Sequence, residues 1–102
     1  MKVIEKYKII IPNTAKQMLI LHKEFLARVS TNGSKKLIQE FYEGIQRIIV
    51  NPKGYPYLDK NKTYRKYIFY KRYLIIYLVE KNIIYIDYIV DTRQNYFNIF
   101  KI

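Results

Sequence analysis

The chain has 102 residues, which fits one folded domain spanning residues 1–102 and leaves no room for two. It contains no cysteine, and this excludes disulfides, thiolate metal sites and cysteine nucleophiles. Nineteen lysines and arginines face eight acidic residues, and the formal net charge of +11 favours polyanionic partners such as RNA, DNA or an acidic protein.

The chain carries no apolar run long enough for a targeting or membrane segment. The apolar run Ile9–Ile11 is ended by Pro12, so we expect no signal peptide. The longest later run, Leu74–Val79, is too short to cross a bilayer. Together with the absence of cysteine, this predicts a cytoplasmic protein that does not enter a membrane.

The N-terminal quarter predicts a strand followed by a helix. The strand is expected at Lys6–Ile11, where β-branched isoleucines gather, and Pro12 ends it. Asn13 or Thr14 is then expected to cap the helix through its side-chain oxygen. Apolar residues recur at helical spacing and predict one buried face. They are Ala15, Met18, Leu19, His22, Phe25, Leu26 and Val29.

A second helix is predicted after the cluster of turn residues Ser30–Ser34. Asn51–Pro52 ends this helix, because proline disfavours helical backbone at the residue before it. The short turn predicts an antiparallel helix hairpin. The apolar side of the second helix comprises Leu37, Ile38, Phe41, Ile45, Ile48 and Ile49. Its polar side comprises Lys35, Lys36, Gln39, Glu40, Glu43 and Arg47.

The pattern changes from helix to strand after a polar loop at Lys53–Lys62. Three runs of β-branched and aromatic residues follow, and the breaks between them are short enough for hairpins. The predicted strands are Tyr64–Phe69, Tyr73–Glu80 and Ile83–Asp91. The tail Thr92–Phe100 is expected to form one or two helical turns.

This order, strand-helix-helix-strand-strand-strand, predicts an α+β fold. The two helices each have one apolar side, and they can bury it together against one face of a small, mainly antiparallel sheet. The other face of the sheet would be left as a concave basic and aromatic surface, or as an interface.

The segment Lys62–Tyr73 is the most unusual stretch of the chain, with five cations, four tyrosines and no acid. Cations neutralise phosphates, and aromatic rings offer faces on which bases stack. Any single tyrosine here is more commonly a core residue. The predicted nucleic-acid-binding residues are Arg65, Lys66, Lys71, Arg72 and Arg93.

Other candidates for chemistry are few. His22, the only histidine, is expected to be packed or partly exposed, because no partner for catalysis or metal binding is found. No metal and no cofactor are expected, since no ligand cluster and no glycine-rich phosphate loop occur. Asp87 and Asp91 are four residues apart on the last strand and are expected on one face. They could act as an acid–base pair; alternatively, Asp91 caps the tail and Asp87 pairs with a cation.

Arg93 and Tyr96 follow the last strand and are expected to emerge at the edge of the sheet, near the same surface as Arg65. A metal-independent endoribonuclease needs a base for the 2′-hydroxyl, cations for the charge that develops on phosphorus and an acid for the leaving oxygen. Arginines can stabilise that charge and tyrosine can donate a proton. Arg65, Arg93 and Tyr96 are therefore the predicted catalytic residues if the chain is a ribonuclease.

Several segments, in this order and spacing, resemble the toxins of the RelE/ParE superfamily. The likeness spans nearly the whole chain, and the ending Asp91–Gln94 is its most specific part. The segments that carry it are Tyr7–Pro12, Asn51–Pro52, Tyr64–Lys66, Lys71–Tyr77 and Ile86–Tyr96.

The resemblance implies the toxin of a type II toxin–antitoxin system, of the kind that stabilises plasmids. It implies a helix hairpin on a small antiparallel sheet, with the first strand beside the later ones. The expected partner is a cognate antitoxin, an acidic or mixed protein whose flexible segments wrap the toxin. RelE-like members cut mRNA on the ribosome, and ParE-like members inhibit DNA gyrase, so either is an expected target.

The sequence departs from the ribonuclease members at one position. They commonly open the third strand with Tyr-Arg, and this chain has Tyr73 and Leu74. Arg72 is expected on the same face as Leu74 if the strand is regular that far, and could partly replace the missing cation. Arg65 and Arg93 match basic positions of the family. Tyr96 lies closer to Arg93 than the catalytic tyrosine of RelE-like members does.

The ending Asp91–Arg93 looks more like the ParE branch, which the sequence slightly favours. Two alternatives remain open at this point. One is a non-catalytic basic module that binds RNA or the ribosome. The other is a decayed toxin that only binds its antitoxin.

Overall fold

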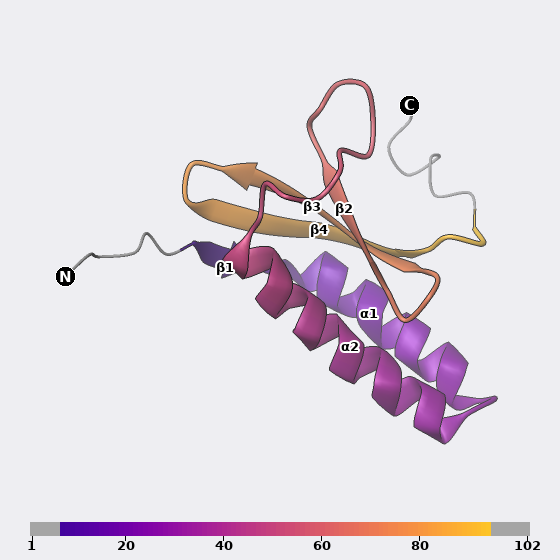
Figure 1. Cartoon of the computed structure of the whole chain (residues 1–102). Coiled ribbons are helices and arrows are strands. Elements are labelled where there is room, and N and C mark those ends of the chain that lie inside the picture. The colour runs from indigo at the N-terminus through magenta and orange to yellow at the C-terminus, as the bar shows by residue number, and fades with distance from the viewer. Residues whose placement is uncertain (1–6, 95–102) are drawn as a thin grey trace.

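The computed structural model describes residues 7–94 and shows two helices packed under a four-stranded sheet (Figure 1). The strand order is β1-β4-β3-β2; β1 runs parallel to β4, and the other neighbours are antiparallel. The predicted α+β class and order of elements are confirmed. The elements are β1 (Lys8–Ile10), α1 (Asn13–Ala27), α2 (Thr31–Val50), β2 (Arg65–Phe69), β3 (Tyr73–Glu80) and β4 (Ile83–Asp91).

Helix α1 begins without a side-chain cap, so the prediction of a cap by Asn13 or Thr14 is wrong. Pro12 is the N-cap residue, with an extended ψ of 158°. Its carbonyl oxygen accepts a hydrogen bond from the backbone N–H of Lys16 at 3.0 Å. The chain therefore turns at the proline, and Asn13 is already helical.

Helix α2 begins earlier than the turn residues suggested. The Oγ of Ser30 caps it by accepting from the backbone N–H of Gly33 at 2.8 Å. Gly33 is helical and allows a close approach, since a Cβ there would lie 3.0 Å from both Ser30 Oγ and the hydroxyl of Tyr70. The helix ends at Asn51, as predicted.

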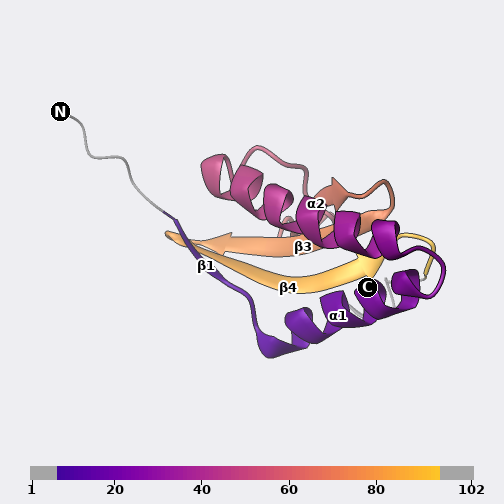
Figure 2. The same cartoon turned by 90° about the horizontal axis from the view of Figure 1, so that it is seen from below.

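The two helices cover one face of the sheet, α1 against β4 and α2 against β2 (Figure 2). Burying these apolar surfaces removes them from water and provides the main stabilisation of the fold. On the helices the core consists of Ala15, Leu19, Leu26, Leu37, Phe41, Ile45 and Ile48. On the sheet it consists of Phe69, Tyr73, Ile75, Tyr77, Ile84, Ile86 and Ile89.

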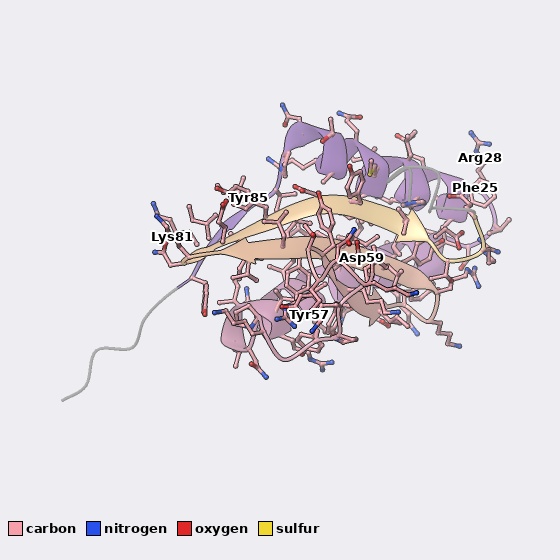
Figure 3. The ribbon with its side chains drawn as sticks, turned by 90° about the horizontal axis from the view of Figure 1, so that it is seen from above. Phe25, Arg28, Tyr57, Asp59, Lys81 and Tyr85 are labelled. Carbon is pink, nitrogen blue, oxygen red and sulfur yellow. The ribbon has the colours of Figure 1, made fainter. Side chains whose placement is uncertain are left out.

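The opposite face of the sheet is apolar and aromatic at its centre rather than basic. A second, smaller core lies there, with Leu74, Ile76 and Val90 buried under Leu58, Tyr64 and Tyr88. The connection between α2 and β2 crosses to this side, and Asp59 lies on it above the sheet (Figure 3).

This connection also protects the outer edge of β2. The backbone N–H of Leu58 donates to the carbonyl oxygen of Tyr64 at 2.7 Å, and that of Lys66 donates to the carbonyl oxygen of Pro56 at 3.0 Å. The predicted polar loop is therefore partly paired with β2, and fewer backbone groups of this edge strand are left open.

Candidate functional site

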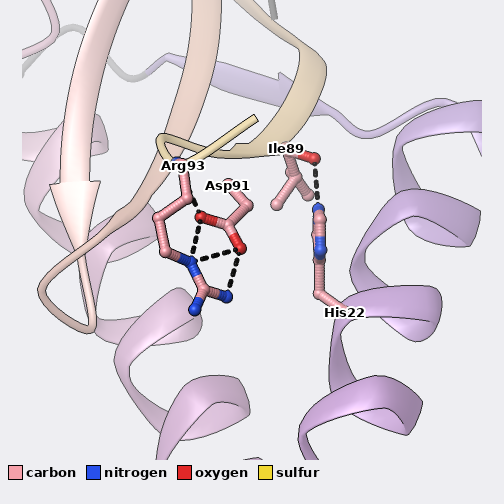
Figure 4. Close-up of polar contacts among 4 residues, drawn as sticks. All are labelled: His22, Ile89, Asp91 and Arg93. Atoms are coloured by element: carbon pink, nitrogen blue, oxygen red, sulfur yellow. Dashed lines mark hydrogen bonds and ion pairs between the residues drawn. The ribbon is translucent and has the colours of Figure 1, made fainter. Parts of the chain in front are cut away.

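The turn after β4 folds the side chain of Arg93 back onto the carboxylate of Asp91 (Figure 4). Nη2 of Arg93 donates to Oδ2 at 2.7 Å, and Nε donates to both carboxylate oxygens at 3.1 Å. The backbone N–H of Arg93 donates to Oδ1 at 2.9 Å. Charge-assisted bonds of this kind are strong and directional, so they hold the guanidinium in one orientation.

The two charges of this pair stabilise each other. Burial raises the pKa of the Asp91 carboxyl, but hydrogen bonds from Arg93 and the charges of Arg93 and Arg72 outweigh burial and bring the pKa below its ordinary 3.8. Hydrogen bonding to Asp91 raises the pKa of Arg93. The Asp91 side chain is only 8% exposed, whereas that of Arg93 is 54% exposed. Within residues 7–94 no hydrogen bond engages Nη1 of Arg93.

Arg93 lines a pocket of about 590 Å³ between α1 and the end of β4. Most of its wall is apolar; three of its four polar residues come from the end of β4 or the turn after it, and His22 comes from α1. The apolar lining residues are Met18, Leu21, Phe25, Ile89 and Val90. The polar ones are His22, Asp91, Arg93 and Gln94. We call this the Arg93 pocket.

His22 joins α1 to β4 at the side of this pocket. Its Nε2 donates to the carbonyl oxygen of Ile89 at 2.9 Å (Figure 4). Its ring meets the ring of Tyr73 edge-on at 5.2 Å. Strand β1 pairs with β4 only as far as Tyr85, so in the described residues the edge of β4 beyond it has no strand partner. His22 satisfies a carbonyl on that edge and is packed, as the sequence predicted.

Arg65 occupies a separate site near the start of β2. Nη1 donates to the carbonyl oxygen of Tyr55 at 2.7 Å and Nη2 to the hydroxyl of Tyr57 at 2.8 Å. The guanidinium carbon also lies 3.9 Å from the centre of the Tyr57 ring. Arg65 thereby ties the α2–β2 connection to the sheet. With Lys53 and Lys62 it lines a polar pocket of about 280 Å³.

The two predicted catalytic arginines do not lie together. Arg65 pairs with Tyr77 of β3, whereas Asp91, two residues before Arg93, pairs with Tyr73. Four residues of strand separate these two positions by about 13 Å. The expected approach of Arg93 to the surface of Arg65 does not bring the two side chains together: Arg65 lies opposite the middle of β3, and Arg93 lies beyond the first residue of β3.

Of the other predicted nucleic-acid-binding cations, Lys66 lies apart from the adjacent Lys71 and Arg72. Lys66 lies in one cross-strand row with Ile76 and Tyr88, on the face away from the helices. Lys71 is exposed in the β2–β3 turn, where its φ of 72° is left-handed.

Arg72 precedes the first residue of β3, so the regular alternation expected for it does not reach it. Its guanidinium carbon lies 5.9 Å from the centre of the Tyr73 ring, and its charge lowers the pKa of Asp91. Arg72 thus belongs to the Arg93 end of the sheet. Leu74 is buried on the opposite face.

Asp87 and Asp91 do not share a face, contrary to the prediction. The register of β4 shifts between Ile76 and Tyr77 of β3 and leaves Asp87 without an opposite residue. Beyond this bulge the alternation is reversed. Asp87 accepts a hydrogen bond from the hydroxyl of Tyr64 at 3.0 Å, on the face away from the helices, rather than pairing with a cation.

Two exposed apolar residues of the Arg93 pocket, Leu21 and Phe25, do not follow from the sequence. Phe25 and Val29 are predicted on the buried face of the first helix, but they are 58% and 77% exposed. Leu21 was assigned no role and is 63% exposed. The available signal was the run Met18–Leu21: four consecutive apolar residues cannot all face the sheet from one helix. Tyr96, the third predicted catalytic residue, lies outside the described residues.

Comparison with protein-family models finds no match, and no curated protein is similar in sequence. Neither helix of the described part is long and apolar enough to cross a membrane. Residues 7–94 hold no group of three or more histidines and carboxylates arranged to bind a metal ion.

Proposed function

We propose that this chain is the toxin of a type II toxin–antitoxin pair of the RelE/ParE kind. The observation that carries the proposal is the helix hairpin on one face of the sheet, with β1 parallel to β4 and Arg93 presented directly after β4. This is the arrangement that the sequence resemblance implies. A net charge of +11 suits a protein that acts on a polyanionic target and is neutralised by an acidic antitoxin.

Of the two expected targets, the geometry supports gyrase inhibition better than RNA cleavage. Cleavage without a metal needs several charged groups around one phosphate. Among the described residues, Arg65 and Arg93 are far apart, and Leu74 takes the place of the arginine that ribonuclease members carry. A toxin that inhibits by binding does not require these groups to converge.

Ribosome-dependent mRNA cleavage is the second candidate, and one observation favours it. His22 and Arg93 line the same pocket, which brings an imidazole and a guanidinium with a free donor to one place. If this activity is present, Arg93→Ala and Arg65→Ala should abolish toxicity without unfolding the chain. Full toxicity in both variants would remove the nuclease roles.

Two assays with the purified protein separate these targets. DNA supercoiling by gyrase is expected to be inhibited, and cell-free translation is expected to leave the mRNA intact when its 5′ ends are mapped. New 5′ ends at ribosome-occupied codons would instead establish the ribonuclease. Salt-dependent RNA binding with neither effect, and with no growth arrest, would point to a non-catalytic RNA- or ribosome-binding module.

A further inference from the structure

Helix α1 carries a second apolar stripe that the fold does not bury. Met18, Leu21 and Phe25 follow one another at spacings of three and four residues, which places them along one side of the helix. Leu21 and Phe25 are 63% and 58% exposed, and Val29, in the turn that follows the helix, is 77% exposed. Adjacent large apolar side chains in water are typical of an interaction site.

This stripe continues into the Arg93 pocket. Met18, Leu21 and Phe25 form its wall on the helix side, and Ile89 and Val90 form its wall on the strand side. The hollow of about 590 Å³ is large enough to take one or two apolar side chains of a partner. The stripe and the pocket are therefore one continuous apolar surface.

At its polar end this surface carries the guanidinium of Arg93, whose orientation is already fixed. Asp91 holds the guanidinium of Arg93 from one side and leaves Nη1 open, in the planar geometry that matches a carboxylate. Arg72 lies near Asp91, and Arg28 projects with Phe25 from the C-terminal end of α1 (Figure 3). Asp91, the one acid of the pocket lining, is neutralised by Arg93.

We propose that this surface binds an acidic amphipathic peptide segment, with a carboxylate on Arg93 and apolar side chains on Leu21, Phe25 and the pocket. The proposal rests on the proposed function only for the identity of the partner, which would be the antitoxin. A second copy of this chain fits poorly, because two proteins of charge +11 repel each other. RNA fits poorly because its sites are dominated by several phosphate contacts, and this pocket has one guanidinium among mostly apolar walls.

The test uses the full chain, labelled with nitrogen-15, and a synthetic helical peptide of about 18 residues. The peptide has leucines on one face and glutamates on the other, and its twin has glutamine at every glutamate. Binding is measured by fluorescence anisotropy, and the contact surface is mapped by amide and arginine Nε–H chemical shifts. A uridylate oligonucleotide is titrated in parallel. The two pocket variants are Arg93→Gln and Phe25→Ser; the matched controls are Lys35→Gln and Tyr42→Ala, on the groove between α1 and α2.

We expect the acidic peptide to shift the signals of Leu21, Phe25 and Arg93. Its affinity should fall about tenfold in each pocket variant and in the glutamine twin, and should stay within about twofold of wild type in the controls. Phe25 is exposed, so Phe25→Ser keeps the fold and decides the test even if Arg93→Gln is unstable.

Four results of the binding experiments would each overturn the proposal. They are no peptide binding, equal binding of the glutamine twin, loss of binding in the control variants, and shifts of the pocket signals by the oligonucleotide alone. Self-association that Phe25→Ser abolishes would also overturn it, since a second copy would then be the occupant. None of these results depends on growth arrest, so the peptide site and the toxin function can fail separately.

Discussion

The imidazole of His22 donates a hydrogen bond to the backbone carbonyl oxygen of Ile89, 2.9 Å away and 67 residues later in the chain. This bond requires the proton on Nε2 and ties the middle of α1 to the edge of β4 that β1 does not cover. The same edge leads to Asp91 and Arg93, so His22 helps to position the strand end that presents the candidate site.

Replacing His22 should therefore weaken the fold at this edge. In His22→Ala the carbonyl of Ile89 loses its partner, and the edge-on contact with Tyr73 is also lost. We expect the free energy of unfolding to fall by about 1–3 kcal/mol. Urea denaturation measures it, with Lys23→Ala as the exposed neighbour that should change little. Equal stability of wild type and His22→Ala would show that the bond contributes nothing.

The pair of Asp91 and Arg93 should control stability in acid. The pKa of Asp91 is below its ordinary 3.8 in the folded chain, so its contribution is present above that pH and is lost as the pH falls through the folded value. In Arg93→Gln the charge of Arg93 and its guanidinium hydrogen bonds are lost, so the pKa of Asp91 should rise. Acid unfolding, followed by circular dichroism, should then begin at a higher pH than in wild type. The control is Arg47→Gln, which replaces an exposed arginine that is hydrogen-bonded to Tyr67. It should leave the pH at which acid unfolding begins unchanged.

The boundaries of the elements followed closely from local sequence. Strands β3 and β4 match the predicted runs residue for residue, and Asn51–Pro52 ends α2 as proline requires. The wrong predictions concern features that depend on residues far apart in the sequence. The sequence cannot reveal the bulge at Asp87, because it depends on how β4 pairs with β3. The same pairing sets Arg65 apart from Arg93.

Which apolar side chains of α1 are exposed also depends on packing against the rest of the fold. The periodicity of α1 indicates an apolar face, but its apolar residues are too many for one face, and only packing decides which of them are buried. Leu19 and Leu26 are in the core, whereas Phe25 and Val29 are in solvent. The Arg93 pocket was therefore only half predictable: Arg93 was identified, and its apolar wall was not.

The lack of a side chain at Gly44 should be needed for the close packing of α2 against β2. A Cβ at this position would lie 2.7 Å from Cε1 of Tyr67, whose hydroxyl accepts a hydrogen bond from Arg47 and whose ring meets Tyr55 at 5.0 Å. Overpacking costs about 1–3 kcal/mol. The gain in helix propensity from glycine to alanine is about 1 kcal/mol. We expect a net loss of stability in Gly44→Ala by urea denaturation.

The control is the same change in a Tyr67→Ala background. With the ring removed, the nearest remaining neighbour of that Cβ is Cδ1 of Ile75 at 3.3 Å, so Gly44→Ala should be less destabilising there than in wild type. A similar effect in both backgrounds would show that Tyr67 is not the obstacle.

Tyr64 should make the fold sensitive to alkali. Burial, together with the hydrogen bond to Asp87, raises its pKa from 10.0 to about 12. The neutral phenol is therefore favoured in the folded chain. Its contribution to stability is complete below pH 10.0 and is lost as the pH rises towards about 12. Urea denaturation over this range should show a shallower decline in Tyr64→Phe than in wild type. An unchanged slope would contradict this role, and Tyr42→Phe, which is exposed, is the control.

Growth of a bacterial culture after induced expression tests the central claim most directly. We predict that the wild-type chain arrests growth, that Arg93→Ala does not when present at the same level and folded, and that Arg47→Ala arrests growth like wild type. Normal growth with the wild-type chain, or full arrest by folded Arg93→Ala, would contradict the account of a toxin that acts through Arg93.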